Sequence, residues 1–189
     1  MTDAVLERLK DICQKYNLVL SVAAKAALAK ETPKAVTNVD NLITGSVTEL
    51  VCATEKSCRK LGYETIILGA DFVCEAKQLA SILVDEFAIY RGHNKLAIIA
   101  GGETVVKVKG NGLGGRNQEL ALTAAKLIDG KHEIAVFSFG SDGTDGPTDA
   151  AGGIVDGFTW QAIKDRGNNP ESLLLNNDAS HALQSVDSL

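Results

Sequence analysis

The spacing of apolar residues changes several times along the chain, and each change marks an expected element. Apolar residues at three- and four-residue intervals indicate amphipathic helices. The expected helices are 2–16, 19–29, 47–61, 75–91, 117–128, 159–165 and 179–186. The second of these must end before Pro33, because a residue that precedes proline avoids helical backbone angles.

Short, nearly continuous apolar runs indicate buried strands between these helices. The expected buried strands are 39–44, 64–68, 95–100 and 133–139, and Ile154 and Val155 begin a further short apolar segment. Residues 103–109 differ because apolar and polar side chains alternate there. Alternation is typical of a strand with one solvated face, so we expect this strand to pair antiparallel with its neighbour.

The order of the elements predicts an α/β fold. The strand at 39–44, the helix at 47–61 and the strand at 64–68 together make a βαβ unit, whose crossover is nearly always right-handed. The polar stretch at 91–94 is the expected domain boundary. The sequence thus predicts a remnant βαβ, Rossmann-like layer over residues 1–91. A mixed-sheet α/β domain is expected over residues 95–189.

Composition excludes several classes of function. The chain of 189 residues has a net charge of −5, so it lacks the basic surface of a nucleic-acid-binding protein. No apolar run approaches the roughly 20 residues of a membrane span, and the N-terminus does not resemble a signal peptide. The four cysteines form no C-x-x-C pair, which favours reduced thiols in a cytoplasmic protein.

A glycine-rich loop precedes the helix at 117–128. Gly110, Gly112 and Gly115 formally match the dinucleotide-binding fingerprint. The preceding segment alternates instead of being buried on both faces, and no acidic residue ends a second parallel strand at the required distance. An anion site is the better interpretation, because Arg116 stands beside free N–H groups at the start of a helix.

The residues around Arg116 are candidates for binding a substrate or a phosphate. They are Gly114, Gly115, Asn117 and Glu119. The alternative is a flexible hairpin exit with an arginine that faces solvent. Ser46 is a further candidate, because it follows an expected strand at the edge where open α/β sheets bind ligands. Its alternative is a helix N-cap, with Glu49 completing a capping box.

A second glycine-rich loop, residues 140–153, carries three aspartates. Asp142, Asp145 and Asp149 could each accept a proton from a substrate hydroxyl or fix Arg116, and Asp142 and Asp145 are the candidates for binding Mg²⁺. The alternative is turn chemistry, since Asp-Gly pairs form turns and Asp149 could cap a helix. Three aspartates among five glycines exceed what a turn requires, which favours a functional loop.

Three segments together resemble a known family, the MOFRL domain. They are Gly101-Gly102-Glu103-Thr104, Gly114-Gly115-Arg116-Asn117-Gln118-Glu119-Leu120-Ala121 and Gly143-Thr144-Asp145-Gly146-Pro147-Thr148-Asp149-Ala150-Ala151-Gly152. This domain is the C-terminal part of the glycerate 2-kinases, many of which bear the name hydroxypyruvate reductase. Residues 38–46 and 60–63 similarly resemble the end of the family's N-terminal domain, so the resemblance covers nearly the whole chain.

The resemblance implies a two-domain α/β kinase. Such a kinase transfers the γ-phosphate of ATP to the 2-hydroxyl of D-glycerate, with magnesium, in a cleft between its domains. Arg116 matches the motif arginine, which would bind the substrate carboxylate or the transferring phosphate. The loop with Asp142, Asp145 and Asp149 would accept the proton or position the metal. Phosphoryl transfer needs these parts, because its catalysis rests on alignment and on positive charge around the moving group.

Family members are much longer than this chain. Their upstream catalytic lysine, Gly-Gly-Gly-Ser loop and Asp-Pro loop have no counterpart here, nor does their closing Thr-Gly-Pro-Thr-Gly-Thr-Asn segment. We therefore expect a fragment that is inactive alone. Absent sheet neighbours would expose apolar edges, so we expect homodimerisation or marginal stability. Two other functions stay open, an NAD(P)H-dependent hydroxypyruvate reductase and a non-catalytic interaction module.

Overall fold

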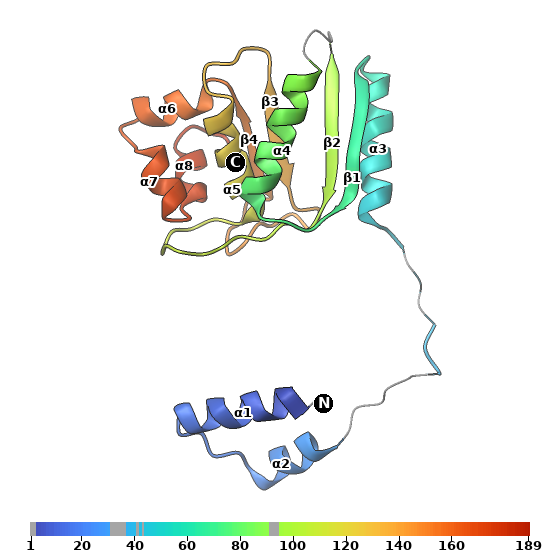
Figure 1. The fold of residues 1–189 in the computed structure, drawn as a ribbon, viewed down its shortest axis with the longest axis vertical. Coiled ribbons are helices and arrows are strands. Elements are labelled where there is room, and N and C mark those ends of the chain that lie inside the picture. Colours follow the sequence, from blue (N-terminus) through green and yellow to red (C-terminus); the bar gives the residue numbers. More distant parts are fainter. Residues whose placement is uncertain (1–2, 31–36, 41, 43, 91–94) are drawn as a thin grey trace. The chain divides into compact units, whose positions relative to one another are not determined.

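The computed structural model describes residues 3–30, 37–40, 42, 44–90 and 95–189 (Figure 1). By its internal contacts the chain divides into two compact units, Met1–Thr44 and Gly45–Leu189. The first unit contains α1 (Asp3–Lys15) and α2 (Val22–Ala29), which confirms both helices expected there. Ser21 caps α2, since its hydroxyl accepts a hydrogen bond from the N–H of Ala24 at 3.1 Å.

The strand expected at 39–44 is not found among the described residues of that segment. Val39, Asp40, Leu42 and Thr44 have no strand pairing and are exposed, and Asn41 and Ile43 lie outside the described residues. An apolar run forms a buried strand only when a sheet neighbour covers it. The expected βαβ unit therefore does not begin here, and the chain forms such a unit one element later.

The second unit contains the remaining helices and strands. They are α3 (Val47–Lys60), β1 (Glu64–Phe72), α4 (Ala76–Ile89), β2 (Leu96–Gly102), α5 (Arg116–Leu127), β3 (Ala135–Phe139), β4 (Gly152–Asp156), α6 (Thr159–Asp165), α7 (Pro170–Leu175) and α8 (Ala179–Gln184). Each element that the apolar spacing predicts between residues 47 and 100 is confirmed, as are the expected helices at α5, α6 and α8 and the strand at β3. Only α7 was not expected as a helix.

β1 and β2 are parallel neighbours, joined by the crossover helix α4. Their register pairs Glu64 with Leu96 and Ile67 with Ile99, and α3 packs against both strands. The two strands lie on either side of residues 91–94, where the domain boundary was expected and which lie outside the described residues. The two compact units meet in the sequence between Thr44 and Gly45, and the expected domains at 1–91 and 95–189 stay a prediction.

Residues 103–109 do not form the antiparallel strand that their alternation predicts. Val105 makes only an isolated parallel bridge with Glu75, through the bonds Val105 N–H to Cys74 and Ala76 N–H to Val105. The chain leaves β2 at Gly102, whose φ of +151° turns it away from the sheet. As the alternation predicts, Thr104 is buried. The segment runs beside the loop before α4, however, and it has no strand as its neighbour.

The core of the second unit surrounds α5. Every residue of this helix from Asn117 to Ala125 is buried, because the helix packs on α4, on the antiparallel pair β3–β4 and on α6, α7 and α8 (Figure 1). The other face of β3–β4 stays open, and Phe137, Phe139 and Ile154 are about half exposed on it. Parallel and antiparallel pairs with covering helices confirm the α/β fold class.

Candidate functional site

A hollow of about 560 Å³ opens at the N-terminal end of α5. Five of the predicted site residues line it, together with residues that had not been named as site candidates. The predicted ones are Gly114, Gly115, Arg116, Glu119 and Asp145. The others that matter chemically are Glu103, Thr104 and Asn177. The glycine-rich loop, the acidic loop and the turn between α7 and α8 therefore meet at one place.

Arg116 is the first residue of α5 and points a partly exposed guanidinium toward this hollow. Its nearest carboxylate belongs to Glu103, whose Oε1 lies 3.5 Å from Nη1. The side chain of Arg116 is 43% exposed and that of Glu103 77%, and an exposed pair of this kind contributes only about 0–1 kcal/mol. An anionic ligand could therefore take the place of Glu103 at little cost.

Asp145 is buried, with 3% of its surface exposed, and its carboxylate closes the N-terminus of α5. Oδ1 accepts hydrogen bonds from the N–H of Asn117 at 3.1 Å and from its side-chain amide at 3.0 Å, and Oδ2 accepts from the N–H of Gln118 at 2.8 Å. Asn117 also accepts a bond from the hydroxyl of Ser138 at 2.7 Å, so it lies beneath the hollow and ties α5 to β3. Asp145 thus acts as a cap from outside the helix.

Two glycines make room for this carboxylate. A Cβ on Gly115 would lie 2.3 Å from Cγ of Asp145, and one on Gly146 would lie 2.5 Å from the carbonyl oxygen of Gly114. Gly146 also has a φ of +61°, which favours glycine. These two glycines are required by the close approach of the two loops to each other.

The backbone N–H groups of the first glycine-rich loop are used by the protein itself. Those of Lys109 and Gly110 donate to Oδ1 of Asn177, at 2.7 and 3.0 Å. The next three, at 111, 112 and 113, donate to Asn176 Oδ1, Asn176 O and Asp178 Oδ1. The amides of residues 109–113 are therefore not available to a dinucleotide.

Glu119 is a buried carboxylate on the wall of the hollow, with its side chain 5% exposed. Oε2 accepts a hydrogen bond from the side-chain amide of Asn177 at 2.8 Å, and Oε1 lies 3.4 Å from Nζ of Lys77 on α4. Both oxygens of this charge are therefore partnered, as burial of a carboxylate requires. Asn177 has a φ of +55° and holds the glycine-rich loop and Glu119 at the same time.

Gln118 holds the acidic loop against α5 through hydrogen bonds. Its side-chain amide donates to the hydroxyl of Thr148 at 2.8 Å, and this hydroxyl donates in turn to the carbonyl of Asp145 at 2.7 Å. Residues 116–119 thus all bond to segments outside α5, which explains why four consecutive polar residues begin a buried helix.

Three predicted site residues lie elsewhere. Ser46 caps α3, and its hydroxyl and the side chain of Glu49 form the capping box that was the alternative interpretation. Asp142 and Asp149 are exposed in the acidic loop and do not line the hollow. The Oδ1 of Asp142 accepts only a long bond, 3.4 Å, from the N–H of Thr144. Their roles stay predictions.

The donor set does not fit the magnesium site expected at Asp142 and Asp145. Both oxygens of Asp145 are already occupied by N–H groups, whereas Mg²⁺ needs carboxylate oxygens free to bind it. Within the part of the chain that the structure describes, no three His, Cys, Asp or Glu side chains are grouped as metal ligands would be. Asp142 and Asp145 together therefore do not form a magnesium site in this structure.

Sequence patterns missed Asn177 and Lys77. Asn177 belongs to a run of three polar residues after an apolar segment, a pattern that surface turns share. Lys77 looks like any lysine on the polar side of a helix. Only the packing of α4, α5 and the turn after α7 brings them to Glu119.

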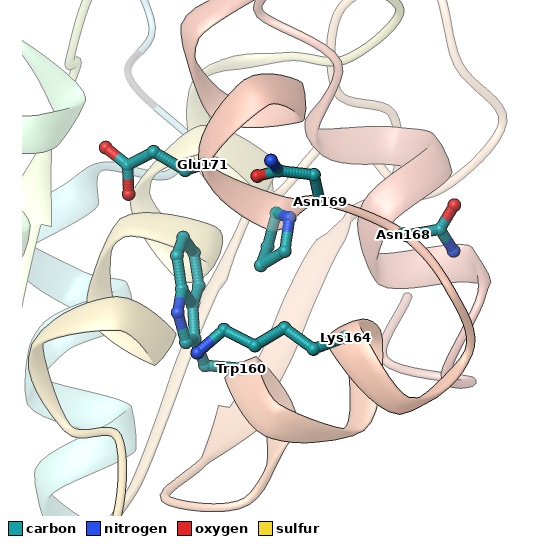
Figure 2. Close-up of a pocket in the computed structure, with 6 residues that line it drawn as sticks. Trp160, Lys164, Asn168, Asn169 and Glu171 are labelled. Atoms are coloured by element: carbon teal, nitrogen blue, oxygen red, sulfur yellow. The ribbon is translucent and has the colours of Figure 1, made fainter.

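A second, shallower hollow of about 410 Å³ lies beside Trp160 (Figure 2). Lys164 extends along the indole, with Nζ 5.9 Å from its centroid, and Lys126 lies 6.0 Å from it. Lys126 is paired with Glu171 at 2.7 Å, and Lys164 lies 4.0 Å from Asp129. Both lysines thus have a carboxylate within ion-pair distance, and the residues that line this hollow belong to neither glycine-rich loop.

Comparison with known proteins matches the segment that contributes most residues to the first hollow to one family. Residues 96–189, which include both glycine-rich loops, match the MOFRL family. This segment belongs to the MOFRL family. The chain is 44% identical over 184 residues to the D-glycerate 2-kinase of Thermotoga maritima, a match that covers 94% of this chain and 44% of that protein.

Two further matches agree with this assignment. The glycerate 2-kinase of Pyrococcus horikoshii is 36% identical over 159 residues, covering 80% of this chain and 36% of that protein. The crystal structure of the glycerate kinase of Thermotoga maritima superimposes with a TM-score of 0.77 at 39% identity, over 97% of this chain and 45% of that one. The chain thus spans less than half the length of these relatives. None of its described helices has both the length and the apolar character needed to cross a membrane.

Proposed function

We propose that this chain provides the Arg116 half of a glycerate 2-kinase, in which ATP donates its γ-phosphate to the 2-hydroxyl of D-glycerate. The observation that carries the proposal is the hollow at α5. It presents a guanidinium whose ion pair among the described residues is with an exposed glutamate, in a segment that matches the MOFRL family. Guanidinium groups bind carboxylates and phosphates through two parallel hydrogen bonds.

Arg116 would bind the carboxylate of glycerate or the transferring phosphoryl group. Gly114 and Gly115 let that anion approach the backbone, and Glu119 holds the wall of the hollow in place through Asn177 and Lys77. Asp142 and Asp149, exposed in the acidic loop, remain the candidates for accepting the proton of the 2-hydroxyl. ATP and a magnesium ion belong to the proposal, with the metal ligands outside the residues that the structure describes at this site.

The structure does not support the sequence motif that favoured a reductase. The support for a reductase in the sequence was the Gly110–Gly115 fingerprint and the name hydroxypyruvate reductase that many members of the family bear, and the amides of residues 109–113 donate to the turn at 176–178. NADH binding without ATP binding would nevertheless support a reductase. A pure interaction module would tolerate loss of Arg116.

A chimera tests the kinase proposal. The matching region of the Thermotoga maritima D-glycerate 2-kinase is replaced by this chain, and ATP-dependent phosphorylation of D-glycerate is measured. We expect activity, and we expect Arg116→Ala to lower kcat/KM by about 10²–10³-fold, the usual cost of removing one charge-stabilising group. Arg116→Lys should recover part of it, because lysine keeps the charge but not the two-pronged geometry.

Arg166 provides the matched control. It is an exposed arginine after α6, away from the hollow, and Arg166→Ala should leave the activity of the chimera unchanged. A chimera that folds like its parent but phosphorylates no glycerate would overturn the proposal. So would full activity of the Arg116→Ala chimera. The 189-residue chain assayed alone is expected to be inactive.

A further inference from the structure

We infer that Asp145 is a positioning residue, which fixes Arg116 for anion binding and is neither the proton acceptor nor a metal ligand of the reaction. The inference rests on the proposed function in one respect, the role of Arg116. The placement of Asp145 itself is a matter of geometry. Its sequence context, an Asp-Gly pair in an acidic loop, suggests a base or a metal ligand, and its contacts show a different use.

The carboxylate of Asp145 is held at the start of α5. Three N–H donors from Asn117 and Gln118 converge on its two oxygens, and only 3% of the residue is exposed. To reach a substrate hydroxyl, the carboxylate would have to leave these donors unpaired inside the protein. Buried donors without partners are strongly disfavoured, so the carboxylate stays on the helix.

This placement fixes the residue that begins the helix. Gly115 lies against the carboxylate on one side of Arg116, and the N–H groups of Asn117 and Gln118 are held on the other. Arg116 is therefore anchored at both of its backbone neighbours. The direction in which its side chain leaves α5 follows from that anchoring.

The same carboxylate offsets the positive end of the helix dipole. An open helix N-terminus attracts anions through its free N–H groups and its partial positive charge. Here a buried negative charge already occupies that position. An anion in the hollow thus depends on the guanidinium of Arg116, and the helix end gives it little additional binding.

The first part of the test uses the 189-residue chain alone. Amide hydrogen exchange is measured by NMR for the wild-type chain, Asp145→Asn, Asp145→Ala and the control Asp165→Asn, which removes an exposed carboxylate from α6. We expect the amides of residues 117 and 118 to exchange about ten-fold faster or more in Asp145→Ala, with Asp145→Asn intermediate and the control unchanged. Unchanged protection in both Asp145 variants would overturn the inference.

Magnesium alone is the second probe. Titration of the wild-type chain with Mg²⁺ should leave the side-chain carboxyl carbon signal of Asp145 unmoved. A saturable shift of that signal would show that the carboxylate leaves the helix for a metal, and the inference would fail.

The third part uses the chimera. Asp145→Asn should raise the KM for D-glycerate about ten-fold, with kcat nearly unchanged and the same pH–rate profile, because Arg116 is displaced while the chemistry remains. A proton acceptor would behave differently, with kcat reduced by about 10²–10⁴-fold, KM unchanged and an altered pH profile. If the unaltered chimera is inactive, the proposed kinase function fails, and the two measurements on the chain alone still decide the role of Asp145.

Discussion

The contact between Gly115 and Asp145 allows a sharp test by substitution. Alanine at position 115 would place its Cβ 2.3 Å from Cγ of Asp145 and 2.5 Å from each carboxylate oxygen. The backbone at this position has φ −135° and ψ −174°, which alanine adopts without strain. The cost of Gly115→Ala is therefore almost entirely the displacement of the carboxylate.

The magnitude follows from three terms. Overpacking a tight contact costs about 1–3 kcal/mol, and loss of a helix cap costs about 0.5–2 kcal/mol. The lower entropy of an unfolded chain with alanine offsets about 0.4–1 kcal/mol of this. We expect Gly115→Ala to lower the free energy of unfolding by roughly 2 kcal/mol, equivalent to about 4–8 °C in Tm for a unit of this size.

Urea denaturation of the wild type, Gly115→Ala, Asp145→Ala and the double variant gives the coupling energy. With Asp145 truncated, the new methyl group meets no carboxylate, so we expect a coupling of about 1–3 kcal/mol between the two sites. Gly45→Ala is the control, because the nearest atom to its Cβ would be 3.9 Å away. Losses that add to within about 0.5 kcal/mol would refute the contact as the cause.

Three other expectations follow from the structure. Asn177→Ala should lower the free energy of unfolding by about 2–4 kcal/mol in urea denaturation, since Glu119 and two backbone N–H groups lose their partner. Hydrogen bonds hold the pKa of Asp156 below its ordinary value, first that from the N–H of Phe158 and then those from Thr159. The charged carboxylate of Asp156 therefore stabilises the fold fully above the unfolded pKa of about 3.9, and this stabilisation is lost as pH falls through the lower folded pKa. Asp156→Asn should remove that part of the dependence of stability on acid pH. The open face of β3–β4 predicts self-association, so serine at Phe137 and Phe139 should shift sedimentation toward the monomer.

Each of these expectations has its own control or contrary outcome. Asn168→Ala changes an exposed asparagine near α7 and should leave stability within about 0.5 kcal/mol of the wild type. Identical acid unfolding of the wild type and the Asp156→Asn variant would contradict the capping account. Equal sedimentation of the wild type and the serine variant would show that the aromatic face is not where copies meet.

The spacing of apolar residues predicted most elements, because one face of each helix must pack against the core. That requirement shows in the residues of the helix itself. Prediction from spacing failed at residues 39–44 and 103–109, where an apolar or alternating pattern was correct but no strand lies beside the described residues. Pairing depends on a neighbour that the segment itself does not contain. The pattern of side chains in a segment can predict that the segment is buried without predicting which strand pairs with it.

The site was predicted in part for the same reason. Arg116 and the glycines beside it were found, because glycine and arginine before a helix are unusual enough to notice. The roles of Asp145 and Asn177 could not be read from the sequence, because each depends on residues about 28 and 58 positions away that fix where the carboxylate or amide points. Side chains of the same type, Asp142 and Asp149, lie in the same loop and remain exposed.

The turn at 176–178 restricts which sequences this fold can accept at the first glycine-rich loop. A Cβ on Gly110 would lie 2.3 Å from the carbonyl oxygen of Asn176, and one on Gly112 would lie 2.4 Å from Cβ of Asp178. Because backbone atoms set the limit at Gly110, changing the side chain at 176 alone cannot relieve it. Gly110 can therefore be replaced during evolution only if the backbone of the turn at 176–178 also takes a different path. In related proteins, an invariant Gly-x-Gly here would record a packing constraint inherited with the turn, and a search for nucleotide-binding proteins by that pattern would collect this family for the wrong reason.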